Sequence, residues 1–191
     1  MSKLFFYDLE TTGLDYKKNA IHQLSAIIVI NGEVKESINI KIRPFEGAEI
    51  SQEALDVGNV TLEQIMAYPP MEEAHAQLIR IMSKYVNRFD KTDKFFLVGY
   101  NNAHFDNDFF REMFIRCDDI YFGSWFWSNS IDTMTLATIN LLDQRSKMIN
   151  FKLSTVANEL GIRLEESKLH DALYDVDLTM QVFYKTKNSL L

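Results

Sequence analysis

Two acidic residues stand two positions apart at the end of the first apolar run of the sequence. Asp8 and Glu10 close the run that begins at Lys3, and a Thr-Thr-Gly turn follows them. We expect Lys3–Leu9 to form a buried strand, in which side chains two positions apart point to one face. Both carboxylates would then face one divalent cation, since Mg²⁺ and Mn²⁺ prefer oxygen ligands. In a chain with 27 acidic residues, solvated turn acids are the alternative interpretation.

Two more acids and a histidine occur in comparable settings further along the chain. Asp106 follows the apolar run 94–100 where we expect a helix to begin, a place where the helix dipole also favours an acid for structural reasons. Near the C-terminal end, His170 and Asp175 are five residues apart, and we expect His170 on the loop before the helix. An imidazole suits a general base because its pKa lies near neutral pH. A plain surface histidine is the alternative.

These residues require a sheet and several helices to hold them. Ile21–Ile30 and Glu33–Arg43 flank Asn31-Gly32, a strong hairpin signal, so the chain is predicted to begin with three antiparallel strands. A further strand is predicted over 94–100. Capping and periodicity predict helices near 51 and 61 and over 70–88, 106–116, 132–142, 153–160 and 172–187. Strand-helix alternation after an antiparallel start predicts an α/β protein with a mixed sheet.

Composition limits the class of protein. With 191 residues, 47% of them hydrophobic, the chain is predicted to form one domain over 1–191. A single cysteine fits a reducing compartment, and no apolar run has the length of a membrane span, so we expect a cytoplasmic protein without membrane contact. The net charge of −7 argues against a broad basic face for nucleic acid. It is compatible with a small acidic pocket that binds cations.

Three motifs, taken in order, resemble those of a known superfamily. DLETTGL at 8–14, NNAHFD at 101–106 and HDALYD at 170–175 are similar to the three motifs of the DEDD 3′-to-5′ exonucleases. The histidine five residues before the last aspartate resembles the histidine branch, since Asp171 stands where the tyrosine branch has tyrosine. The segment 50–65 also resembles one in the proofreading subunit of bacterial DNA polymerase III. The resemblance implies an RNase H-like fold, with a five-stranded mixed sheet flanked by helices.

The resemblance also implies a chemistry. The enzyme would hydrolyse single-stranded DNA from its 3′ end and release nucleoside 5′-monophosphates, with two Mg²⁺ or Mn²⁺ ions as cofactors. Asp8 would bridge both ions, Glu10 and Asp175 would complete one site, and Asp106 would support the other through water. His170 would take the proton of the attacking water. A polymerase or repair partner is left open.

Substrate contacts are implied for five further residues: Thr11, Thr12, Leu14, Asn102 and Phe105. For the threonine pair, closing a turn is the structural alternative, and for Phe105 it is core packing. Many relatives of the polymerase subunit carry His-Gly where this chain has Gly58-Asn59, so the contacts to the terminal sugar are expected to differ. The aromatic run 121–130 is a candidate platform for stacking bases, although core packing is the favoured interpretation.

Several alternatives remain at this point. The same enzyme type would suit trimming of RNA 3′ ends, and the same fold would suit a nucleic-acid-binding module without activity. A two-metal phosphomonoesterase would leave the motif order unexplained. Of the remaining histidines, we interpret His22 as a strand-edge residue, His75 as a helix-surface residue and His104 as a turn residue.

Overall fold

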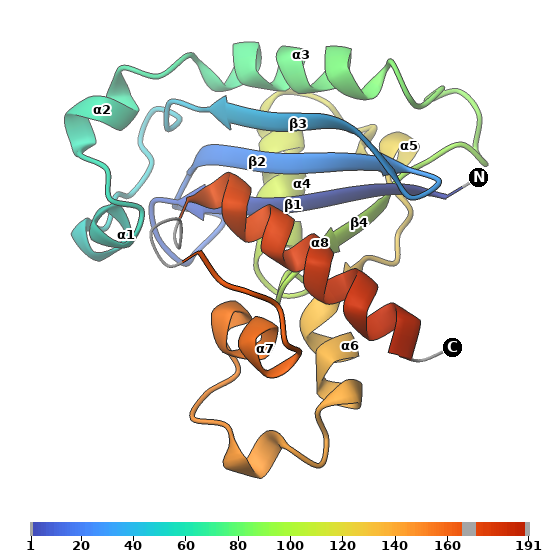
Figure 1. The fold of residues 1–191 in the computed structure, drawn as a ribbon. Helices are drawn as coiled ribbons and strands as arrows, with labels where there is room; N and C mark the ends of the chain where they lie inside the picture. Colours follow the sequence, from blue (N-terminus) through green and yellow to red (C-terminus); the bar gives the residue numbers. More distant parts are fainter. Residues whose placement is uncertain (1, 166–170, 190–191) are drawn as a thin grey trace.

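A five-stranded mixed sheet forms the centre of the molecule (Figure 1). The structure, a computed structural model, describes residues 2–165 and 171–189. The strand order is β3-β2-β1-β4-β5, with β1 at Lys3–Thr11, β2 at Ile21–Ile30, β3 at Glu33–Lys41, β4 at Phe96–Gly99 and β5 at Ile131–Asp132. The first three strands are antiparallel, whereas β4 and β5 run parallel to β1. The predicted five-stranded mixed sheet is confirmed.

The turn between β2 and β3 has the predicted hairpin geometry. Asn31 and Gly32 have φ angles of 53° and 86°. Positive φ at both central residues is the geometry that matches the right-handed twist of the two strands. Beyond a register shift between Ile28 and Val29, the hairpin pairs Gln23 with Lys41.

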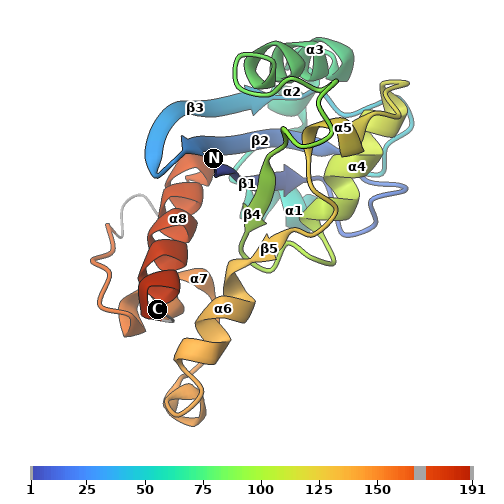
Figure 2. The ribbon, with the colours of Figure 1, turned by 90° about the vertical axis from the view of Figure 1, so that its right-hand side faces the viewer.

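Helices cover both faces of the sheet, as Figure 2 shows most clearly. On one face, α3 (Met71–Met82), α4 (Asp106–Arg116) and α5 (Phe122–Trp125) pack against Phe5, Tyr7 and Leu9. On the other face, α8 (Ala172–Ser189) packs against Leu4, Phe6 and Ile27. The pleat of β1 therefore sends alternate side chains into two separate apolar layers. The remaining helices are α1 (Gln52–Val57), α2 (Leu62–Met66), α6 (Thr133–Asn140) and α7 (Leu153–Glu159), with a short 3₁₀ turn η1 at Arg145–Lys147.

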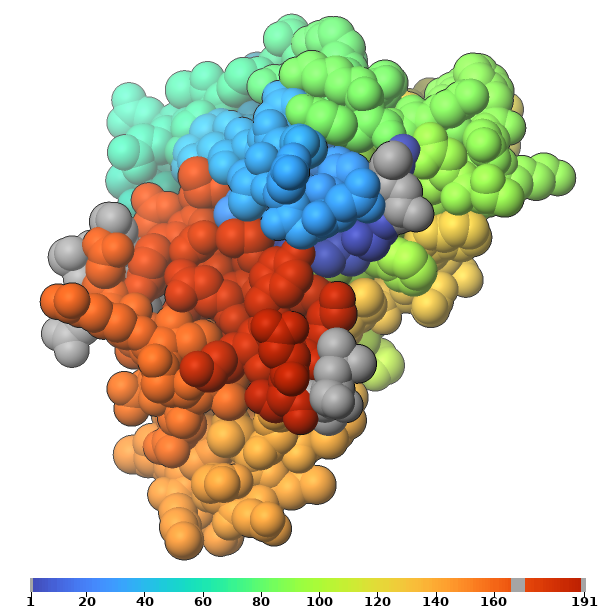
Figure 3. Space-filling model, turned by 45° about the vertical axis from the view of Figure 1, so that its right-hand side comes forward, coloured from blue at the N-terminus to red at the C-terminus, as the bar shows by residue number. Residues whose placement is uncertain are grey.

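A third apolar cluster joins α6, α7 and α8. Ala137, Val156, Ala157 and Leu178 are fully buried in it. In Figure 3 the segment from α6 to α7 forms the end of the molecule beside α8. Among the described helices, none is both long and apolar enough to cross a membrane.

The aromatic run 121–130 is mainly a core element, as favoured from the sequence. Phe122, Trp125 and Phe126 are each 5% exposed or less. The rings of Phe122 and Phe126 lie 5.5 Å and 5.4 Å from the ring of Phe110 on α4. Tyr121, in contrast, is 54% exposed. The run therefore anchors α4 to the sheet.

Three sequence-based expectations were wrong in detail. The helix predicted over 70–88 ends at Met82, where the Ser83 hydroxyl donates to the Ile79 carbonyl and closes the last turn. His22 is fully buried within β2 and is no strand-edge residue, because β1 and β3 flank it on both sides. His75 is half-buried, with its Nε2 3.2 Å from the Asp119 carboxylate, since α3 packs against the end of α4.

Candidate active site

Three elements bring the four predicted metal-binding acids to one end of the sheet. Asp8 and Glu10 lie on β1, and their alternation with buried Leu9 places both on one face. Parallel pairing of β1 with β4 directs the loop after Gly99 to the same edge, where Asp106 begins α4. Asp175 lies in the first turn of α8. Parts of the chain far apart in sequence therefore meet at the carboxyl ends of two central strands.

The electrostatics of Asp8 show how closely these acids are grouped. Burial raises the pKa of Asp8 well above its ordinary value, and the charges of Asp106, Glu10 and Asp175 raise it further. Burial likewise raises the pKa of Asp106 to about 7, against the backbone amides of Asp106 and Leu9, which lower it. Carboxylates that repel one another in a partly buried site favour protons or a cation between them.

The donor set fits a hard divalent cation, because it consists of carboxylate oxygens. Within residues 2–165 and 171–189, no three acidic, histidine or cysteine side chains yet enclose a point that could hold an ion. Coordination of a cation by these acids therefore stays a prediction. His170, the predicted general base, lies outside the described residues, and α8 begins two residues after it.

A fifth acid at the site was not identified from the sequence. Asp132 accepts hydrogen bonds of 2.9 Å from the backbone N–H groups of Asn101 and Met134. It thereby caps α6 and fixes the loop that leads to Asp106, and its charge contributes to the raised pKa of Asp106. Its place beside the site depends on the pairing of β4 with the two-residue strand β5, for which the sequence carries no clear signal.

Hydrogen bonds between Tyr7, Asn107 and Ser130 connect the elements that carry the acids. The Tyr7 hydroxyl donates to Asn107 Oδ1 at 2.6 Å, and Asn107 Nδ2 donates to Ser130 Oγ at 2.8 Å. These bonds link β1, the first turn of α4 and the approach to β5. The helix that carries Asp106 is thus fixed relative to the strand that carries Asp8.

The predicted substrate residues differ in accessibility. Leu14 is 86% exposed on the loop after β1, whereas Thr12 is fully buried. The Thr12 hydroxyl donates to the Glu49 carbonyl at 2.8 Å and accepts from the Ala20 N–H at 2.9 Å, so its side chain is used in closing the turn. The Thr11 hydroxyl donates to the Gly13 carbonyl at 2.8 Å.

The other two predicted substrate residues lie on the loop before α4. Asn102 is fully buried against Gly99, where a Cβ would lie 2.7 Å from the Asn102 Cβ, so this position requires glycine. Phe105 is half-buried, with its ring 4.9 Å from that of Phe109. The substrate roles of all five residues remain predictions.

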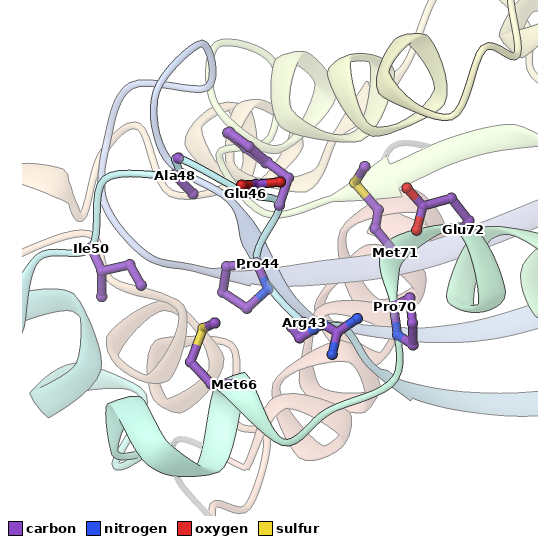
Figure 4. Close-up of a pocket in the computed structure, with 11 residues that line it drawn as sticks. Arg43, Pro44, Glu46, Ala48, Ile50, Met66, Pro70, Met71 and Glu72 are labelled. Carbon is purple, nitrogen blue, oxygen red and sulfur yellow. The ribbon is translucent and has the colours of Figure 1, made fainter.

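A separate hollow of about 500 Å³ lies beyond the end of β3 (Figure 4). Its lining includes Arg43, Met66 and Met71, with Glu46 and Glu72 among the charged residues. None of the four acids of the site contributes to it. This surface hollow is therefore separate from the candidate active site.

The mixed sheet thus gathers carboxylates from β1, α4 and α8 at one end, a set of oxygen ligands of the kind that binds hard divalent cations in enzymes. The Exonuclease family model (RNase_T) matches residues 5–183, and the chain belongs to this family. Membership of the DEDD 3′-to-5′ exonuclease superfamily, predicted from the three motifs, is thereby confirmed.

Among the proteins similar in sequence are a bacterial DNA polymerase and a ribonuclease. The chain is 28% identical over 177 residues to a PolC-type DNA polymerase III of Mycoplasmopsis pulmonis, covering 93% of this chain but 11% of that protein. It is 26% identical over 189 residues to the Ribonuclease T of Hahella chejuensis, covering 95% of this chain and 81% of that protein.

The fold is also that of E. coli exonuclease I. A zinc-bound complex of that enzyme with single-stranded DNA superposes with a TM-score of 0.76 at 21% identity, over 99% of this chain and 41% of that one. This likeness confirms the RNase H-like exonuclease fold.

Proposed function

We propose that this protein is a 3′-to-5′ exonuclease that hydrolyses single-stranded DNA with the help of two divalent cations, Mg²⁺ or Mn²⁺. The observation that carries the proposal is the meeting of Asp8, Glu10, Asp106 and Asp175 at one end of the sheet, where three of these charges raise the pKa of the fourth. Membership of the Exonuclease family supports the reaction class.

Each acid has a distinct role in the proposed site. The charges of the other three acids all act on Asp8, which supports a role for it in contacting both ions. Glu10 and Asp175 would complete one ion site, and Asp106 would support the other through water. Bound cations would activate water, offset charge on the phosphoryl oxygens and stabilise the leaving 3′ oxygen. His170 would accept the proton of the attacking water, and the product would be a nucleoside 5′-monophosphate.

Two nucleic acids compete as substrate. The structural likeness to a nuclease crystallised with single-stranded DNA and the PolC-type relatives favour DNA. The similarity to Ribonuclease T, over most of both chains, favours RNA as the second candidate. Leu14 is 86% exposed, so its side chain would be accessible to separate the terminal base from its neighbour in either substrate.

The test uses 5′-labelled single-stranded DNA and RNA of equal sequence, with Mg²⁺, Mn²⁺ or EDTA. We expect a metal-dependent ladder that shortens from the 3′ end, with DNA degraded faster. Asp8→Asn is the inactive control, and Asp15→Asn, an exposed acid on the neighbouring loop, is the matched active control. Intact oligonucleotides under every metal condition would contradict the proposal, and faster loss of RNA would reverse the order of substrates.

A further inference from the structure

A polar row crosses the sheet beside the proposed catalytic acids. Glu10 on β1 is paired with Gln23 on β2, which is paired with Lys41 on β3. Residues directly opposite one another in antiparallel strands have side chains on the same face. Neighbouring strands lie about 4.8 Å apart, so the Cα of Lys41 is about 10 Å from that of Glu10. Lys41 therefore lies on the same face of the sheet as Glu10, two strands away.

Lys41 has polar neighbours but no carboxylate partner among the described residues. Its Nζ donates to Gln23 Oε1 and lies 5.6 Å from the centre of the Tyr68 ring. Gln23 Nε2 in turn donates to Asn39 Oδ1 at 3.0 Å. The part of the chain that the structure describes forms seven ion pairs, and Lys41 takes part in none of them. Two contacts thus hold the side chain in place while its charge has no directly bonded counter-ion.

The surroundings of Lys41 indicate which kind of group would neutralise its charge. Burial lowers the pKa of Lys41, while the charges of Glu10 and Asp171 raise it, so the amine stands in the field of the acidic site. The apolar part of the same sheet face, around Phe6 and Ile27, is covered by α8. The polar part containing Lys41 continues from the catalytic acids toward the edge strand β3.

We propose that Lys41 is a substrate-positioning residue that binds a phosphate group of the nucleotide adjoining the scissile bond. This inference rests on the proposed exonuclease function. A flexible ammonium group acts as a point charge for phosphate oxygens. In a protein with a net charge of −7, a cation held beside the acids would help a polyanionic strand approach them. Gln23 and Tyr68 would hold the amine in position to contact the phosphate.

The test measures binding and turnover separately. Fluorescently labelled single-stranded DNA is titrated, in an Asp8→Asn background that prevents cleavage, at several salt concentrations. For Lys41→Met we expect about tenfold weaker binding, as for one lost charge-assisted hydrogen bond. The slope of log K against log salt should decrease by about 0.7, as for one phosphate contact with a single strand. Lys41→Arg should restore most of both.

The matched control is Lys35→Met, which removes the same charge from the other end of β3, where the exposed amine pairs with Glu33. It should leave affinity and salt slope unchanged. In the active protein, Lys41→Met should raise KM with kcat within about twofold. Lys41→Gln serves as a second variant if thermal unfolding shows that the methionine variant is destabilised.

The outcomes separate the two proposals. If Lys41→Met and Lys41→Gln keep the salt slope of the parent protein, the phosphate contact is refuted while the exonuclease function stands. If the parent protein cleaves nothing, the proposed function fails, and the binding titration still decides whether Lys41 contacts phosphate. Absence of binding to single-stranded DNA in the Asp8→Asn background, together with absence of cleavage by the parent protein, would overturn both proposals.

Discussion

Replacing Asp106 by asparagine should stabilise the metal-free protein at alkaline pH while abolishing its activity. Burial raises the pKa of Asp106 from 3.8 to about 7. Between these values the folded state holds a proton that the unfolded state has lost, so stability falls as pH rises through this window. The difference of about three pKa units corresponds to on the order of 4 kcal/mol above pH 7. Asparagine has the same shape and does not titrate.

The assay is urea unfolding in EDTA at pH 4 and pH 8. The two proteins should have similar free energies of unfolding at pH 4, whereas Asp106→Asn should exceed the parent at pH 8 by a few kcal/mol. Asp108→Asn, at an exposed acid in the first turn of the same helix, is the matched control. An advantage of Asp106→Asn that is equal at both pH values would refute the reasoning, because it would have no electrostatic origin.

Three further predictions follow from the same structure. Mn²⁺ should raise the melting temperature more at pH 8 than at pH 5.5, because the ion competes with protons bound at Asp8 and Asp106; equal rises by thermal shift would contradict this. Burial lowers the pKa of His22 from 6.5 to about 4, so the folded state loses about 2 kcal/mol of stability between pH 8 and pH 5. His22→Leu should remove this loss, as measured by urea unfolding. The prediction fails if the free energies of unfolding of the variant and the parent protein fall equally between these pH values. Leu14→Ala, at an exposed site, should change stability by less than about 0.5 kcal/mol yet raise KM, which steady-state assays with single-stranded DNA would measure.

The sequence predicted the elements whose signals are local. The hairpin at Asn31-Gly32, the capping box at Thr61 and the start of α4 at Asp106 each depend on neighbouring residues, and all three are confirmed. The end of α3 was misplaced because apolar residues continue beyond Met82 into a turn that buries Val86. Local pattern cannot distinguish such a turn from another turn of helix.

Features that depend on contacts distant in sequence were not predictable in the same way. The motifs predicted which acids form the site, whereas the closeness of Asp132 to them follows from a two-residue parallel pairing. The burial of His22 follows from the flanking strands and from Gly58, where a Cβ would lie 3.4 Å from the imidazole ring. The placement of Lys41 on the same face as Glu10 depends on the register of three strands, which the sequence alone does not give.

The central position of β1 divides the acids of the site between parts of the molecule with different protection from local opening. Asp8 and Glu10 belong to β1, the middle strand of the sheet. The apolar side chains of β1 pack into the clusters on both faces of the sheet. Backbone amides of such a strand exchange with solvent only when the whole domain unfolds. Asp175 lies at the beginning of a helix, where fraying requires far less free energy. A transient loss of the first turn of α8 would therefore move Asp175, a proposed metal ligand, away from the other acids while the sheet stays folded.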